Sequence, residues 1–184
     1  MSGATHRVYF ALWPDPALRA ELSAAVAPVL TGLGGRPVQP ANLHLTLEFI
    51  GAVAASQLDR LLALGATLSW PAVTLTLDYP EWWRGSQALV LRVLAPAEPL
   101  LALQAALRRR IAELGLAVDD RPYRPHVTIA REVAAQPAHA TPVSVAWRAA
   151  TVALIESHPA PGGSHYRPLG LWHAADAKSE FPVI

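Results

Sequence analysis

Two short stretches of this chain repeat the same chemically active side chains at the same spacing. His44 and Thr46 stand two residues apart, and His126 and Thr128 repeat that arrangement much later in the sequence. Two imidazoles, with an ordinary pKa of about 6.5, can act as general base and general acid near neutral pH. Two hydroxyls beside them can donate hydrogen bonds to phosphoryl oxygens. The paired motif therefore indicates displacement at a phosphorus atom.

Other kinds of catalytic site lack the residues that they need. The absence of cysteine excludes a disulfide framework, a thiolate metal site and a cysteine nucleophile. Neither motif histidine has a second histidine at the spacing of a zinc site, although Glu48 is expected to share a face with His44. We therefore expect no metal and no cofactor.

Both motifs lie in stretches where polar and apolar residues alternate, which is typical of half-buried strands. In the first stretch, strict alternation puts the apolar side chains on one face, namely Leu43, Leu45, Leu47 and Phe49. It puts the polar side chains on the other face, namely His44, Thr46 and Glu48. One face is thus expected to pack and the other to present chemistry.

The elements around the motifs follow from periodicity, caps and turn residues. We expect a first strand over residues 6–13, and then a helix that starts after Asp15, as its N-cap, and runs to Gly32. A second helix should follow Gly51, and the clearest helix covers residues 99–114. Residues 73–79 and 88–94 are predicted to pair as a hairpin, and three further strands are expected over 143–147, 151–157 and 165–172. The extended, proline-containing loop 119–125 should deliver His126 to its strand.

These elements predict an α+β fold in a single compact domain over residues 1–184. We expect it to be bilobal, with two similar antiparallel β-sheets backed by helices and a central cleft that carries one motif on each wall. The 52% hydrophobic and 16% charged composition argues against disorder, and the net charge of +1 limits any RNA contact to a local patch. No stretch offers the roughly 18 apolar residues of a membrane span. We expect a monomeric, cytoplasmic protein.

The two motifs also resemble a known family. Leu43 to Gly51, Arg124 to Arg131, and Glu156 and Ser157 followed by Gly163 and Tyr166 resemble the bacterial and archaeal RNA 2′,3′-cyclic phosphodiesterases. These enzymes, also called 2′-5′ RNA ligases, are a branch of the two-histidine phosphoesterase superfamily. The resemblance implies a bilobal fold and metal-independent opening of a 2′,3′-cyclic phosphate at an RNA end to a 2′-phosphate. It also implies that the reaction sometimes runs in reverse to form a 2′-5′ linkage.

The resemblance assigns a role to each motif residue. It makes His44 the general acid and His126 the general base, with Thr46, Thr128 and Arg131 as phosphate contacts. Strict alternation would turn Arg131 toward the core, so a strand end or a bulge after Ala130 must redirect it. Two aromatic residues are further candidates for substrate contact, namely Phe49 and Tyr123. Their rings could stack on a base or ribose, or could instead pack in the core or between the lobes.

Two other functions stay open. The substrate could be a small cyclic phosphate, such as one derived from ADP-ribose, in place of an RNA end. The protein could also bind nucleotides or RNA without turnover, although a binder would need arginines and aromatic rings but not two imidazoles with matched hydroxyls.

Overall fold

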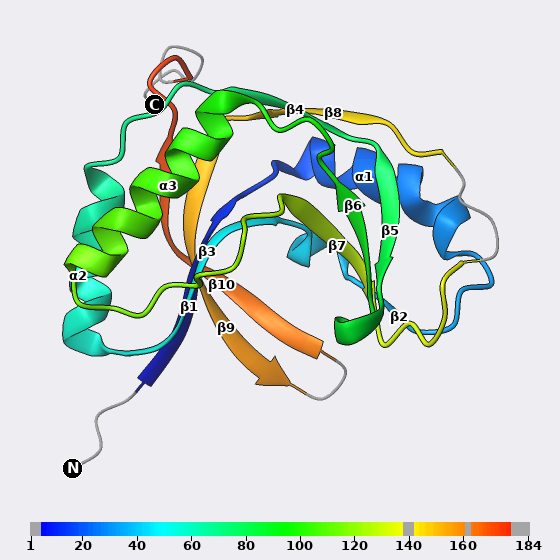
Figure 1. The fold of residues 1–184 in the computed structure, drawn as a ribbon, viewed down its shortest axis with the longest axis horizontal. Coiled ribbons are helices and arrows are strands. Elements are labelled where there is room, and N and C mark those ends of the chain that lie inside the picture. The colour runs from blue at the N-terminus through cyan, green and yellow to red at the C-terminus, as the bar shows by residue number, and fades with distance from the viewer. Residues whose placement is uncertain (1–4, 138–141, 161–162, 178–184) are drawn as a thin grey trace.

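Two antiparallel sheets and three α-helices make up the fold in the computed structural model (Figure 1), which describes residues 5–137, 142–160 and 163–177. The larger sheet has eight strands, in the order β10-β9-β1-β3-β7-β6-β5, with β2 paired to β7. Its strands are β1 (Thr5–Leu12), β2 (Arg36–Pro37), β3 (Leu45–Ala54), β5 (Tyr79–Trp83), β6 (Ala88–Arg92), β7 (His126–Arg131), β9 (Thr151–Ala160) and β10 (Gly163–His173). The predicted α+β class with two antiparallel sheets is confirmed.

The large sheet is built of two halves that meet at one residue pair. Leu45 of β3 and Val127 of β7 form that pair, and each follows a motif histidine by one residue. The half made of β1, β3, β9 and β10 therefore carries the first motif, and the half made of β2, β5, β6 and β7 carries the second. The two lobes expected from the sequence are thus joined through their motif strands.

The helices gather in two places, at the left and at the right of Figure 1. α1 (Pro16–Leu30) begins as predicted, with Asp15 accepting a hydrogen bond from the Leu18 backbone N–H at 2.8 Å. α2 (Ala55–Ala66) packs on β1, β3, β9 and β10, and α3 (Glu98–Glu113) packs on β3 beside it (Figure 1). Short 3₁₀ turns occupy Pro40–Asn42 and Arg84–Ser86. Buried side chains of all three helices and both sheets form one cluster. No helix in the described ranges is long and apolar enough to span a bilayer.

The predicted hairpin between residues 73–79 and 88–94 is wrong. β4 (Val73–Leu77) pairs instead with β8 (Val145–Ala149), and these two strands form the small sheet. The partner of β6 is β5, which includes residues 81–83 that the sequence placed in a turn. The alternating pattern identifies a strand but not the strand that pairs with it. The buried side chains of β4 and β8 lie opposite one another, as in the pair of Leu75 and Trp147.

Candidate active site

His44 lies immediately before β3, and a hydrogen bond to the nearby backbone fixes its imidazole ring. Its Nδ1 lies 2.7 Å from the carbonyl oxygen of Asn42, two residues earlier. The Asn42 side chain in turn donates a hydrogen bond from Nδ2 to the carbonyl oxygen of Ser164 in β10, at 2.9 Å. The segment that carries His44 is thereby fixed to the neighbouring hairpin of β9 and β10.

His126, the first residue of β7, is held in the same way. Its Nδ1 lies 2.6 Å from the carbonyl oxygen of Arg124. Trp83, at the end of β5, packs against the His126 ring with centroids 4.3 Å apart, and the Arg124 guanidinium lies over the Trp83 ring, 4.9 Å from its centroid. The contact between Trp83 and His126 could not be predicted from the sequence, because the strand β5 that carries Trp83 was not predicted.

These matched bonds determine which ring nitrogen can react. A carbonyl oxygen only accepts hydrogen bonds, so Nδ1 is the donor in both His44 and His126. In the neutral ring Nε2 is then the unprotonated nitrogen, and in the charged ring Nε2 is a proton donor. Both histidines are therefore prepared for proton transfer through the same atom.

Both histidines have lowered pKa values. Burial lowers the pKa of His44 from 6.5 to about 4, with smaller contributions from the charges of Arg131, His126 and Arg19, while the bond to Asn42 acts in the opposite direction. Burial also lowers the pKa of His126, and Arg131 again contributes. The positive charge of Arg131 thus disfavours the protonated form of both imidazoles.

Three aromatic rings surround His44 on the first half of the sheet. The ring centroids of Tyr9, Tyr166 and Trp13 lie 5.0, 5.2 and 6.1 Å from that of His44. The Arg19 guanidinium lies over the ring of Trp13, 4.4 Å from its centroid. Sequence reasoning recognised the strand that carries Tyr9 but not its pairing with β3, which is what brings this ring to the site.

A β-bulge directs Arg131 away from the core, as the sequence required. Thr128 of β7 pairs with Val90, and Ala130 pairs with Leu89, so Ile129 is the extra residue. The bulge therefore lies one position before Ala130, not after it. Ile129 and Ala130 are both buried, and Arg131 is exposed at the strand end.

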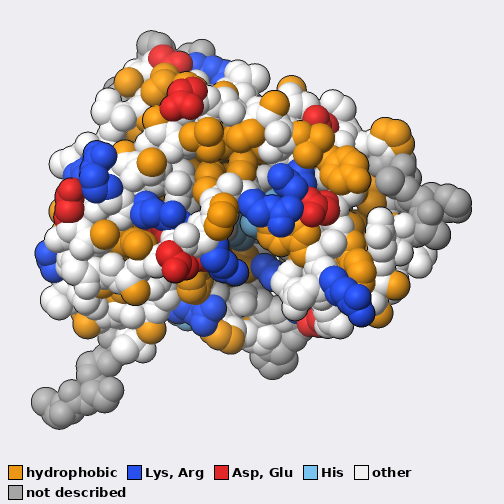
Figure 2. Space-filling view, viewed as in Figure 1, with side chains coloured by type: hydrophobic (Ala, Val, Ile, Leu, Met, Phe, Trp, Pro, Cys, Tyr) orange, Lys and Arg blue, Asp and Glu red, His pale blue; other side chains and the backbone are white. Residues whose placement is uncertain are grey.

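A cavity of about 790 Å³ opens between the two halves of the sheet. Its lining includes three of the predicted site residues, His44, Thr128 and Arg131, together with residues of β2 and β10 that were not predicted. His126 and Thr46 are not among the lining residues. Figure 2 shows a hollow near the centre of this face, with a histidine in its depth and basic side chains around it.

Two bulges in β3 overturn part of the predicted alternation. Leu47 and Ile50 are extra residues relative to β1, so that Glu48 pairs with Phe10 and Phe49 pairs with Tyr9. Glu48 therefore points to the helix side, where it is 3% exposed, and does not share a face with His44. Phe49 points to the opposite side and is 41% exposed. The predicted faces of these two residues are wrong, because each bulge reverses the side on which later residues emerge.

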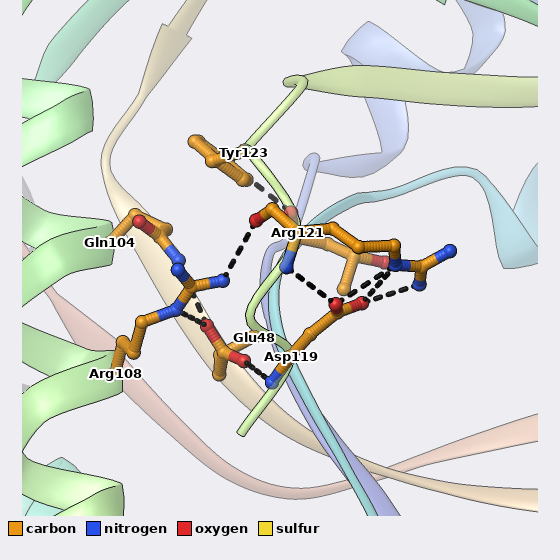
Figure 3. Close-up of polar contacts among 7 residues, drawn as sticks. Glu48, Gln104, Arg108, Asp119, Arg121 and Tyr123 are labelled. Carbon is orange, nitrogen blue, oxygen red and sulfur yellow. Dashed lines mark hydrogen bonds and ion pairs between the residues drawn. The ribbon is translucent and has the colours of Figure 1, made fainter.

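The buried Glu48 links β3 to the loop that leads to His126 (Figure 3). Its Oε2 accepts hydrogen bonds from Gln104 at 2.8 Å and from Arg108 at 3.3 Å, both on α3. Its Oε1 accepts the backbone N–H of Asp119 at 3.1 Å, and Arg108 also donates to the carbonyl oxygen of Arg121 at 3.2 Å. The Arg121 guanidinium bonds Asp119 and holds the pKa of that carboxyl at about 2. One carboxylate thus ties strand, helix and loop together.

The remaining predicted site residues have distinct surroundings. Tyr123 donates from its hydroxyl to the carbonyl oxygen of Thr46 at 3.3 Å, and burial raises its pKa. Thr46 pairs with Ala11, which belongs to the small cluster around Tyr9 on the cavity side of the sheet. The ring of Phe49 lies under the guanidinium of Arg7, 4.9 Å from its centroid. Neither aromatic candidate lines the cavity.

Known proteins share this arrangement of strands and the sequence around it. A family model described as the 2′-5′ RNA ligase superfamily matches residues 13–158, which include both motifs. The chain belongs to the 2′-5′ RNA ligase superfamily. Within this superfamily, the protein named RNA 2′,3′-cyclic phosphodiesterase from Escherichia coli is 33% identical over 168 residues, which cover 90% of this chain and 95% of that protein.

Two further relatives support membership of the superfamily. A Thermus thermophilus protein, also named RNA 2′,3′-cyclic phosphodiesterase, is 32% identical over 175 residues, covering 87% of this chain and 86% of that one. The crystal structure of Escherichia coli LigT complexed with 3′-AMP has a TM-score of 0.83 and 31% identity, covering 94% of this chain and 99% of that one. The resemblance inferred from the motifs is confirmed.

Proposed function

We propose that this protein hydrolyses the 2′,3′-cyclic phosphate at an RNA end to a 2′-phosphate, without a metal ion. The observation that carries the proposal is the matched pair of histidines, each with Nδ1 bonded to the backbone two residues earlier and both affected by Arg131. The names of the relatives from Escherichia coli and Thermus thermophilus support the same substrate class.

The reaction needs one base and one acid on opposite sides of the phosphorus atom. Nε2 of His126 removes a proton from water, and the water oxygen forms a bond to phosphorus. The bond from phosphorus to O3′ breaks, and O3′ takes the proton of His44 Nε2. The products are a 2′-phosphate and a free 3′-hydroxyl, and each proton transfer contributes about 10²- to 10⁴-fold to the rate.

The non-bridging phosphoryl oxygens gain negative charge in the transition state and need donors. Thr128 and Arg131 line the cavity beside His44, and Thr46 emerges on the same side of β3 as His44. The proposal assigns these three side chains to the phosphoryl oxygens, where a guanidinium can bind two of them at once. The proposal assigns no substrate contact to Phe49 or Tyr123, because neither lines the cavity.

The low pKa of His44 places a condition on its role as acid. At about 4, this pKa leaves the ligand-free imidazole neutral at pH 7. The anionic phosphate of the substrate raises the pKa, because a nearby opposite charge favours the protonated ring. The negative charge of the bound substrate therefore favours the protonated form of His44, which can then donate its proton to O3′.

The same groups can also join two RNA ends. A 5′-hydroxyl of a second RNA takes the place of the attacking water, His126 removes its proton, O3′ leaves with the proton of His44, and a 2′-5′ linkage forms. Ligation and hydrolysis then share one transition-state geometry, and the concentration of the acceptor hydroxyl decides between them.

Comparison of two substrates tests the proposal. An RNA oligonucleotide with a 2′,3′-cyclic phosphate end should be converted to the 2′-phosphate, as seen by ³¹P NMR. Turnover of an ADP-ribose cyclic phosphate alone would favour the small-molecule function, and binding of both substrates without turnover would favour a nucleotide-binding protein.

A further inference from the structure

Arg36 is a second arginine in the cavity, and no catalytic step uses it. It is the first residue of β2 and pairs directly with Arg131 of β7. Directly opposed residues in an antiparallel pair send their side chains to the same face, with Cβ atoms about 5 Å apart. Both side chains line the cavity that contains His44. Two guanidiniums therefore lie on one wall of the cavity, one strand apart.

Contacts on two sides fix the Arg36 side chain. Its Nη2 donates to Glu132 Oε1 at 2.8 Å, and this ion pair lowers the pKa of Glu132. A Cβ on Gly163, at the start of β10, would overlap the Arg36 guanidinium, and Gly163 has a φ of +137°. Since Gly163 belongs to the first half of the sheet and Arg36 to the second, the arginine crosses between the two walls of the cavity.

The chemistry of an RNA end calls for such a residue. The terminal ribose carries the cyclic phosphate on O2′ and O3′, and it carries the preceding phosphodiester on O5′. A second anion therefore accompanies the reacting phosphate within one nucleotide. A guanidinium presents five N–H donors in a fixed fork, so it can hold a carboxylate and a phosphate together. The cavity, about 790 Å³, lies within the usual range of about 300 to 1,000 Å³ for ligand sites.

We propose that Arg36 binds the phosphodiester that precedes the terminal cyclic phosphate, and so makes the protein prefer a polynucleotide end to a cyclic mononucleotide. The inference rests on the proposed function and adds the determinant of substrate length. Arg131 binds the reacting phosphate, and Arg36 binds the neighbouring phosphodiester. Glu132 and Gly163 hold the Arg36 guanidinium in place.

Three substrates of matched chemistry test this role: adenosine 2′,3′-cyclic phosphate, an adenosine dinucleotide ending in the cyclic phosphate, and the same dinucleotide with an uncharged methylphosphonate linkage. Arg36→Ala should raise KM about tenfold for the charged dinucleotide, the size expected for one charge-assisted hydrogen bond. It should leave KM unchanged for the other two substrates. Arg109→Ala is the matched control, because this exposed α3 arginine pairs with Glu113 outside the cavity.

Calorimetry gives the same comparison without turnover. The wild type should bind a 2′-phosphate-ended dinucleotide more tightly than adenosine 2′-phosphate, and Arg36→Ala should remove that difference. An inactive wild type would contradict the proposed function, while the calorimetric difference would still decide the role of Arg36. Equal losses for all three substrates, or no loss for any, would overturn the inference.

Discussion

The carboxylate of Glu48 accepts the backbone N–H of Asp119 at 3.1 Å, so a residue of β3 holds the loop that ends at His126. The bond joins the two halves of the sheet on the side opposite the cavity. Tyr123 crosses the same boundary by bonding the carbonyl oxygen of Thr46. The relative position of the two histidines therefore depends on polar contacts outside the cavity.

Glu48→Gln should lower kcat about tenfold with little change in KM. The substituted amide turns an N–H group toward donors on Gln104 and Arg108, which displaces the loop before His126, and small displacements of catalytic groups are costly. Steady-state kinetics and thermal unfolding would measure both effects. The matched control is Glu113→Gln on the exposed end of α3. A lowered Tm with unchanged kcat would mean that Glu48 only stabilises the fold.

Under the proposed mechanism each motif histidine should be required, His126 for the bond that forms at phosphorus and His44 for the bond that breaks. His44→Ala and His126→Ala should each lower turnover of a cyclic phosphate about 10²-fold or more. A substrate whose 3′ bridging atom is sulfur needs no proton on its leaving group, so its hydrolysis should be much less sensitive to His44→Ala than to His126→Ala. The reverse order of sensitivity would exchange the two roles. Circular dichroism of each variant controls for folding.

The pH optimum of kcat/KM should lie below 6.5. The active form has one histidine protonated and the other neutral, and its population is greatest midway between the two pKa values, whichever residue holds the proton. Both pKa values are lowered by burial, that of His44 to about 4, so this midpoint is acidic. A pH-rate profile with a cyclic mononucleotide checks it. Proton NMR should show the His44 titration moving upward in pH when inorganic phosphate is added, and an alkaline optimum would contradict the assignment.

Activity should survive removal of divalent metal ions. In the proposed steps, His44 and His126 carry out both proton transfers. Arg131 and the two threonines stabilise the charge on the phosphoryl oxygens, so no step requires a metal ion. Turnover in EDTA should equal turnover in magnesium-containing buffer. Loss of activity in EDTA that is restored by one divalent metal would show that the mechanism is incomplete.

The sequence was sufficient for the parts of the site that depend on local pattern. Alternation identified the strands that carry His44 and His126, and the conflict between alternation and a cavity role for Arg131 indicated a bulge near Ala130. The contacts of Trp83 and Arg36 could not be predicted, because they depend on which strands become neighbours. Glu48 was misplaced for a related reason. Its alternating surroundings give no local sign that an extra residue precedes it, and only the pairing with β1 reveals it.

The two bulges of β3 have opposite effects on the side from which the following side chains emerge. Leu47 reverses the sides on which Glu48 and Phe49 emerge, and Ile50 restores them, so Val53 is again buried on the helix side. Deleting either extra residue alone would leave one end of the strand facing the wrong way, either the His44 end or the end that enters α2. Deleting both would keep the two ends in frame and alter only the stretch between them. An evolving chain could therefore change this strand by two residues more easily than by one.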